Sequence, residues 1–148
     1  MTVAWLTRFG DRIERGPAAS FRCARCGEVA GVVRVARAGT TVNMGPSAGT
    51  QTPDRDGLVL DYFLGTAWYA QTGEILDTVQ ALIDQGHVDP LAIREIDWAF
   101  WEITPFYCPD CGLNYCSSDW ETYVLVDEGF YDCTMGTCPN GHRHTLDD

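Results

Sequence analysis

The chain has 148 residues, 45% of them apolar and 11% aromatic, and its 21 acidic side chains against 10 basic ones give a net charge of −11. This length fits one ordinary domain, and the composition excludes collagen-like and disordered chains. The net charge argues against a sequence-independent grip on nucleic acid, since such binding requires Lys and Arg contacts to phosphates. Nucleic acid is therefore not an expected partner.

Neither a membrane span nor a signal peptide is predicted. The longest apolar run, residues 58–70, is broken by Asp61 and is shorter than the roughly 20 residues that a membrane-spanning helix requires. Arginines also interrupt the first 15 residues, where a signal peptide would carry its apolar region. These features predict a cytoplasmic protein.

The basic residues, all of them arginine, are concentrated near the N-terminus. Residues 1–37 carry seven arginines and three acids, an excess of +4, which leaves −15 on the other 111 residues. Opposite charges within one small domain usually pair, so we expect this segment to pair with the acidic body; the alternative is an acidic partner. The absence of lysine fits a GC-rich genome, and the alternative is avoidance of lysine modification beside an amine-conjugating system.

The first predicted elements are a strand, a loop and a helix. β-branched residues predict a strand over residues 29–37, and a composition of Gly, Thr, Ser, Asn, Pro and Asp predicts a loop over residues 38–57. Residues 74–85 place five aliphatic side chains on one helical face, and Gly86 follows where a helix-terminating glycine belongs.

The second half begins with a predicted short helix over residues 91–95, preceded by an Asp-Pro start signal. The aromatic stretch 96–107 predicts a strand in its later part, and the alternative is a helix that continues to Trp101. A β-hairpin is expected from residues 120–126 and 130–133, joined by an Asp-Glu-Gly turn.

Two short cysteine motifs predict a first metal site. Each places two residues between its thiols and a glycine after the second thiol. This spacing lets both thiolates reach one ion at about 2.3 Å, and the glycine permits a positive φ that points backbone N–H groups at the sulfurs. The predicted ligands of this structural zinc are Cys23, Cys26, Cys108 and Cys111. A redox motif would need a βαβ context, and a disulfide framework would leave one of seven thiols unpaired.

The remaining candidates predict a second zinc. Eight ligands complete two closed tetrahedral sites, whereas a catalytic zinc would keep one position open. The predicted ligands of the second site are Cys116, Cys133, Cys138 and His142. His142 is preferred over His144 because it lies in a Pro-Asn-Gly-His turn that can return its ring toward Cys138.

Two assignments of ligands to ions are open. The preferred one follows the chain order given above, because the predicted hairpin would return Cys116 to the vicinity of Cys138. The cross-braced alternative joins Cys23 and Cys26 to Cys116 and Cys133, and Cys108 and Cys111 to Cys138 and His142.

Together these elements predict an α+β fold, a zinc ribbon with a long, partly helical insertion and a C-terminal β-hairpin. A single zinc-binding domain would span residues 1–148, with zinc-binding β elements at 23–37 and 104–148 and the insertion at 38–103. In such a domain the metal substitutes for part of a thin core.

The paired CxxCG motifs resemble a zinc ribbon, in the general style of small bacterial zinc proteins. The stretch from Cys108 to Cys116, with eight ligands ending in Cys-Pro-x-Gly-His, also resembles RING and in-between-RING modules of ubiquitin ligases. The chain departs from those modules in lacking a C-x-H-x-x-C centre and in the long gap after Cys26. The RING resemblance implies an E2-like partner if the fold agrees.

Two function hypotheses follow. The first is a zinc-stabilised module that binds another protein and has no catalytic residues, because closed cysteine-rich sites contribute folding energy rather than chemistry. The second is a component of ubiquitin-like conjugation, either as an adaptor or with Cys116 as a nucleophile; the second zinc would then be held by Cys133, Cys138, His142 and His144. Metal-dependent hydrolysis is not expected, because no HExxH or comparable constellation is present.

Overall fold

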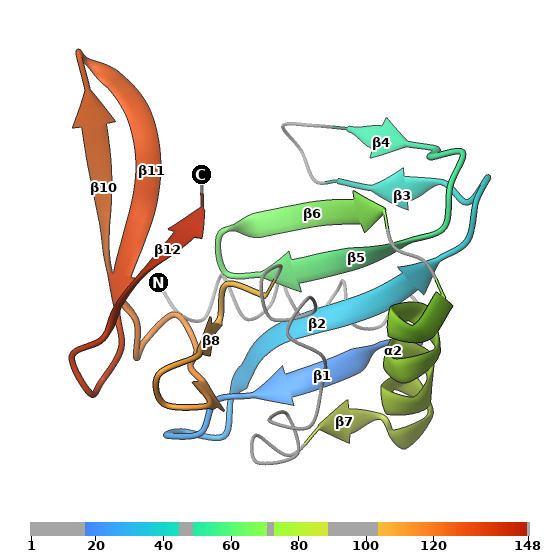
Figure 1. The fold of residues 1–148 in the computed structure, drawn as a ribbon, viewed down its shortest axis with the longest axis horizontal. Helices are drawn as coiled ribbons and strands as arrows, with labels where there is room; N and C mark the ends of the chain where they lie inside the picture. The colour runs from blue at the N-terminus through green and yellow to red at the C-terminus, as the bar shows by residue number, and fades with distance from the viewer. Residues whose placement is uncertain (1–16, 45–48, 71–72, 89–103, 148) are drawn as a thin grey trace.

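The computed structural model describes residues 17–44, 49–70, 73–88 and 104–147 (Figure 1). In these residues one helix accompanies a series of mostly short strands. The elements are β1 (Ala19–Arg22), β2 (Val29–Ala36), β3 (Val42–Asn43), β4 (Thr50–Gln51), β5 (Gly57–Tyr62), β6 (Gly65–Ala70), α2 (Gly73–Gln85), β7 (His87–Val88), β8 (Tyr107–Cys108), β9 (Leu113–Asn114), β10 (Glu121–Asp127), β11 (Phe130–Thr137) and β12 (Arg143–Asp147).

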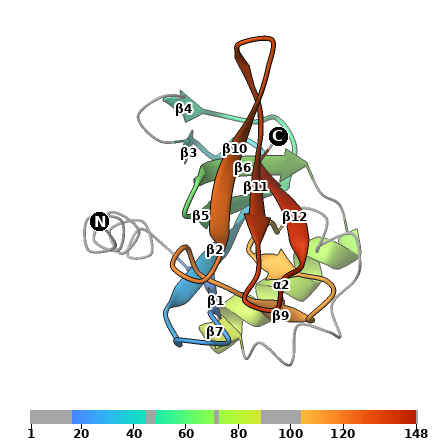
Figure 2. The same cartoon turned by 90° about the vertical axis from the view of Figure 1, so that its left-hand side faces the viewer.

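The main sheet has five strands in the order β6-β5-β2-β1-β7. Its neighbours pair antiparallel except β1 and β7, which are parallel. A second sheet has the order β10-β11-β12, and β3-β4 and β8-β9 form two-stranded ribbons. The β10–β11 hairpin lies to one side of the main sheet (Figure 1), and in the turned view its tip reaches beyond that sheet (Figure 2).

One continuous core joins the main sheet, α2 and the C-terminal part of the chain. The helix buries Leu76, Val79 and Ile83 in this core. From the C-terminal part, Phe106 is fully buried with its ring centroid 5.5 Å from that of Phe21. A Cβ atom at Gly31 would overlap the Phe106 ring, so this aromatic side chain requires glycine on β2.

The helix predicted over residues 74–85 is confirmed as α2. It ends where expected, because Gly86 adopts a φ of 81° and its N–H donates to the carbonyl of Ile83 at 3.0 Å. The strand predicted over residues 29–37 is confirmed as β2. The C-terminal hairpin is also confirmed as β10 and β11, with Glu128 and Gly129 both at positive φ in the two-residue turn, at 50° and 85°.

The predicted fold class is wrong. Strands dominate the described residues, and the middle of the chain is not a partly helical insertion separate from a ribbon. Instead β5 pairs with β2 and β6 pairs with β5, so both belong to the main sheet. Every residue of β5 is buried. The sequence reasoning missed this because a strand buried on both faces gives a continuous apolar run rather than an alternating pattern.

The loop predicted over residues 38–57 contains the small β3–β4 ribbon. Val42 of this ribbon is buried against Ala36 and Val59, so part of the segment packs on the main sheet. The predicted helix at 91–95 and most of the predicted strand region 96–107 lie outside the described residues. In the described part of the chain, no helix has the length and apolar character needed to cross a membrane.

Two arginine–aspartate pairs near β2 allow a matched test of burial. Arg34 donates to Asp61 at 2.9 Å, and this carboxylate is only 1% exposed. Arg37 meets Asp56 at 3.4 Å, and both side chains are largely exposed. We expect Arg34→Ala to lower the free energy of unfolding by about 3 kcal/mol, because it leaves a buried carboxylate without its cation.

The control, Arg37→Ala, should cost less than about 1 kcal/mol, because water screens exposed pairs. Urea denaturation of each variant measures both values. Equal losses of unfolding free energy in the two variants would contradict the conclusion that burial makes the Arg34–Asp61 pair the more costly one to break.

Candidate metal centres

The two CxxCG turns, which we call the first knuckle (Cys23–Gly27) and the second knuckle (Cys108–Gly112), share one backbone hydrogen bond and a glycine at positive φ. The N–H of Gly27 donates to the carbonyl of Cys23 at 3.0 Å, and that of Gly112 donates to the carbonyl of Cys108 at 2.8 Å. Both glycines adopt positive φ, at 77° and 69°. Each glycine lets the chain turn directly behind its second thiol, so both sulfurs of a turn face the same side.

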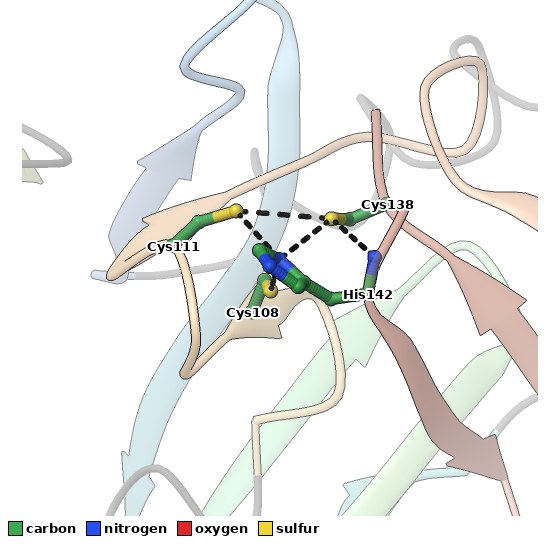
Figure 3. A group of neighbouring side chains, drawn as sticks. All are labelled: Cys108, Cys111, Cys138 and His142. Carbon is green, nitrogen blue, oxygen red and sulfur yellow. Dashed lines mark hydrogen bonds between the residues drawn. The ribbon is translucent and has the colours of Figure 1, made fainter. Parts of the chain in front are cut away.

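Four side chains converge in what we call the C-terminal cluster: Cys108, Cys111, Cys138 and His142 (Figure 3). The sulfurs of Cys111 and Cys138 are 3.7 Å apart, and His142 Nδ1 lies 3.2–3.6 Å from the three sulfurs. A tetrahedral zinc with usual bond lengths gives about 3.8 Å between sulfurs and about 3.6 Å between sulfur and nitrogen. The cluster therefore has nearly the size that such an ion requires.

A second group, the N-terminal cluster, contains Cys23, Cys26, Cys116 and Asp119. The sulfurs of Cys26 and Cys116 are 3.4 Å apart. Asp119 Oδ2 accepts from the thiols of Cys23 at 2.9 Å and of Cys116 at 3.5 Å. Three thiols and one carboxylate thus surround a common point, and this set could also hold a metal ion.

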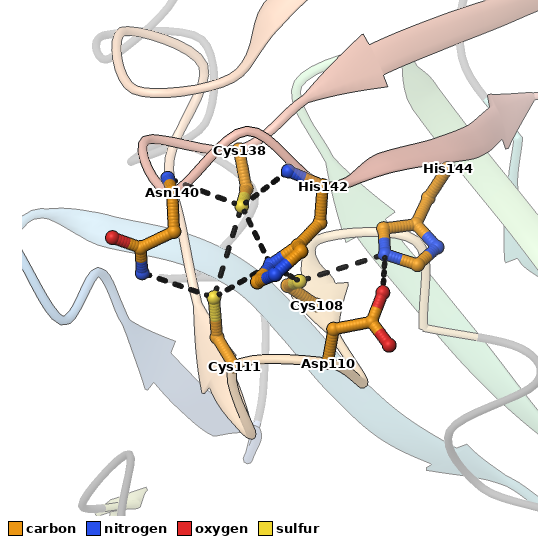
Figure 4. A network of polar contacts seen from close by, with 7 residues as sticks. All are labelled: Cys108, Asp110, Cys111, Cys138, Asn140, His142 and His144. Carbon is orange, nitrogen blue, oxygen red and sulfur yellow. Dashed lines mark hydrogen bonds and ion pairs between the residues drawn. The ribbon is translucent and has the colours of Figure 1, made fainter.

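Outer hydrogen bonds support the C-terminal cluster (Figure 4). The Asn140 side-chain amide donates to Cys111 Sγ at 3.1 Å, and the backbone N–H groups of Asn140 and His142 donate to Cys138 Sγ at 3.3 and 3.4 Å. His144 Nε2 lies 3.1 Å from Asp110 Oδ2 and 3.5 Å from Cys108 Sγ. Such outer partners orient ligands and stabilise negative charge on sulfur.

The thiols of the clusters differ in acidity. Burial raises the pKa of Cys108 and of Cys116 to about 12. Burial also acts to raise the pKa of Cys111, but hydrogen bonds with Asn140 and Tyr115 outweigh it and lower this pKa to about 6. Without a cation, Cys108 and Cys116 therefore keep their protons at neutral pH. Metal binding must displace those protons, so the affinity for metal falls as the pH is lowered.

Seven of the eight sequence-predicted ligands lie in the two clusters, but their grouping differs from the preferred chain-order scheme. Cys23 and Cys26 lie with Cys116, while Cys108 and Cys111 lie with the Cys138–His142 turn. This interleaved grouping matches the cross-braced alternative except at Cys133. The backbone accounts for it: the N–H of Ala24 donates to the carbonyl of Asn114 at 2.9 Å, which places the first knuckle beside the turn at Cys116.

Cys133 belongs to neither cluster, since it lies on β11 opposite Leu125. Asp119 takes the place that the cross-braced alternative gave to Cys133. A signal for Asp119 was present in the sequence: Cys116-Ser-Ser-Asp119 repeats the two-residue spacing of the knuckles. The N–H groups of Asp119 and Trp120 both donate to the carbonyl of Cys116 at 3.1 Å, so this segment is a third turn of similar form.

Comparison with known proteins identifies the family. Residues 12–148 match the family model described as a domain of unknown function, DUF8328. The chain belongs to the DUF8328 family. The match covers both clusters and every described element. No curated protein and no solved structure matches the chain.

Asp119 and Cys133 provide a direct test of the N-terminal cluster. We expect Asp119→Ala to weaken metal binding there by about 10–100-fold or more, since losing even an outer partner of a ligand costs that much. Cys133→Ala should leave the metal content and affinity unchanged, because its sulfur lies outside both clusters. Competition with a chromophoric chelator measures the affinities. Loss of an ion from the Cys133 variant would contradict the grouping.

Proposed function

We propose that this DUF8328 protein binds two structural zinc ions and acts as a protein–protein interaction module. The observation that carries the proposal is the presence of two four-donor groups rich in cysteine. Thiolate and imidazole donors at tetrahedral spacing favour zinc over the harder divalent cations. One ion would lie in each of the clusters defined above.

The donor count supports a structural rather than a catalytic role. Four protein donors complete a tetrahedral zinc and leave no position for water or substrate. The burial of Cys108, Cys116 and Cys138 supports the same conclusion, although Cys26 of the N-terminal cluster is exposed. A catalytic zinc needs an open position, and four protein donors leave none.

Zinc in these positions would link segments that are far apart in the chain. Cys26 and Cys116 are 90 residues apart, and Cys111 and Cys138 are 27 apart. An unfolded chain has no preformed site, so metal-binding free energy contributes directly to the stability of the fold. The two ions would hold the first knuckle and the C-terminal sheet against the same core.

An exposed apolar surface supports the interaction role. On the β10–β11 hairpin, Val124 is 56%, Val126 63% and Phe130 77% exposed. Clustered apolar side chains rimmed by polar ones are typical of surfaces that bind other proteins. The Cys138–His142 turn joins β11 to β12, so the C-terminal cluster lies at one end of the sheet from which the hairpin extends.

The second candidate is an adaptor in ubiquitin-like conjugation. The interleaved order of the clusters favours it, because RING-like modules also alternate their ligand pairs between two ions. Cys116 is a poor candidate for a nucleophile, because it is 3% exposed and lies in the N-terminal cluster, where its sulfur would be a metal ligand. Genes for E1-like or E2-like proteins beside this one would favour the adaptor.

The zinc proposal predicts two zinc ions per chain by native mass spectrometry. Cys26→Ser and Cys111→Ser should each lose one ion, because they remove ligands of different clusters. Chelation should unfold the protein cooperatively, since the buried thiols lose the cation that compensates them. Fewer than two ions in metal-replete protein, or an unchanged circular dichroism spectrum after chelation, would contradict the proposal.

The interaction proposal predicts position-specific crosslinking. A photoreactive amino acid in place of Phe130 should crosslink the metal-loaded protein to a different protein in its native cells. The same group in place of Asp77, which is exposed on α2, is the matched control and should not. Crosslinks from neither position would overturn the interaction role. Crosslinks from the Asp77 position alone would keep that role and move it away from the hairpin.

A further inference from the structure

Strand β10 has an outer edge with no partner strand among the described residues. It lies at the end of the β10-β11-β12 sheet, and all seven of its residues are exposed. An edge of this kind presents backbone N–H and C=O groups that another strand can pair with. The hairpin also stands clear of the main sheet, with β10 on the side away from that sheet, so a neighbouring chain can approach that edge (Figure 1).

Both faces of the hairpin carry large exposed side chains. Along a strand, alternate residues face opposite sides, so Tyr123 and Leu125 lie on one face and Val124 lies on the other. Phe130 and Tyr131 add aromatic surface at the start of β11, with 77% and 51% of each exposed. A strand added beside β10 would pair with its backbone, and its side chains would pack beside those of β10 on both faces.

The charge around this edge has one sign. Glu121 and Asp127 stand at the two ends of β10, and Glu128 and Asp132 lie in and after the turn. No lysine or arginine occurs in residues 117–142. A strand that pairs here therefore meets negative charge at both ends, and basic residues at matching positions would favour its binding.

The same charges disfavour a second copy of this chain as the occupant. Antiparallel pairing of two β10 strands centred on Val124 would place Glu121 of each copy opposite Asp127 of the other. Like charges directly opposite each other across a strand pair are destabilising. A segment of a different protein with basic residues at these positions avoids this repulsion.

We propose that the outer edge of β10 binds an extended segment of a partner protein as an added strand. The segment carries Arg or Lys near both ends, opposite Glu121 and Asp127, and uncharged β-forming residues between them. This inference rests on the proposed interaction role and names the chemistry of the partner. The C-terminal cluster then has a mechanical purpose, because it fixes the sheet from which the binding edge projects.

The test uses a labelled synthetic peptide, Arg-Thr-Val-Thr-Val-Thr-Arg, and the metal-loaded protein. Fluorescence anisotropy should show binding that weakens with added salt, because opposed charges contribute. A peptide with Glu in place of both Arg residues should bind at least tenfold more weakly. Hydrogen exchange with the basic peptide bound should slow at amides of β10.

Charge reversal supplies the decisive variant. E121R/D127R should reverse the preference, so that the acidic peptide binds at least tenfold better than the basic one. The matched control, E74R/D77R, changes two exposed acids on α2 and should keep the original preference. Zinc content and circular dichroism of each variant establish that it is folded.

Three results would overturn the inference: equal binding of the two peptides by the unmodified protein, no change of preference in E121R/D127R, or slowed exchange confined to other strands. Dimerisation that E121R/D127R abolishes would also overturn it, in favour of a second copy. These failures are distinct from failure of the proposed function. That failure would appear as fewer than two zinc ions, or as the absence of crosslinks from either tested position.

Discussion

The contact between the Cys23–Gly27 turn and β9 joins cysteine motifs that are far apart in the chain. A backbone hydrogen bond from Ala24 to Asn114 places Cys23 and Cys26 beside the turn that begins at Cys116. The second knuckle has already turned at Gly112, so Cys108 and Cys111 face the Cys138–His142 turn instead. The interleaving of the two clusters agrees with this contact, because it brings the Cys23–Gly27 turn to Cys116 rather than to Cys108 and Cys111.

The apolar core and the clusters support each other. Phe106 packs on Gly31 of β2, and its carbonyl accepts from the N–H of Tyr115, while the buried Tyr62 hydroxyl of β5 donates to the carbonyl of Leu146 on β12 at 2.8 Å. These contacts connect the main sheet to the segments that flank the C-terminal cluster. Beyond them the β10–β11 hairpin has little core of its own, so its apolar side chains remain exposed.

Local patterns in the sequence were sufficient for several elements. The apolar face of residues 74–85 predicted α2, the turn residues predicted the β10–β11 hairpin, and β-branched residues predicted β2. Strands β5 and β6 were missed, because β5 pairs with β2 and β6 pairs with β5, and no local period in the sequence records either pairing. The fold class was wrong for that reason, since adding these strands to β1 and β2 turns an expected ribbon and insertion into one sheet.

The sequence by itself determined the chemistry of the clusters: cysteine and histidine donors, the two-residue spacing that points both thiols to one side, and the glycines that permit the turns. These properties depend on only a few consecutive residues. The tertiary structure alone decided which turns share a cluster, that Asp119 stands where Cys133 was expected, and that the edge of β10 is left exposed. Each of these outcomes depends on segments separated by tens of residues, and their approach is set by packing of the whole core.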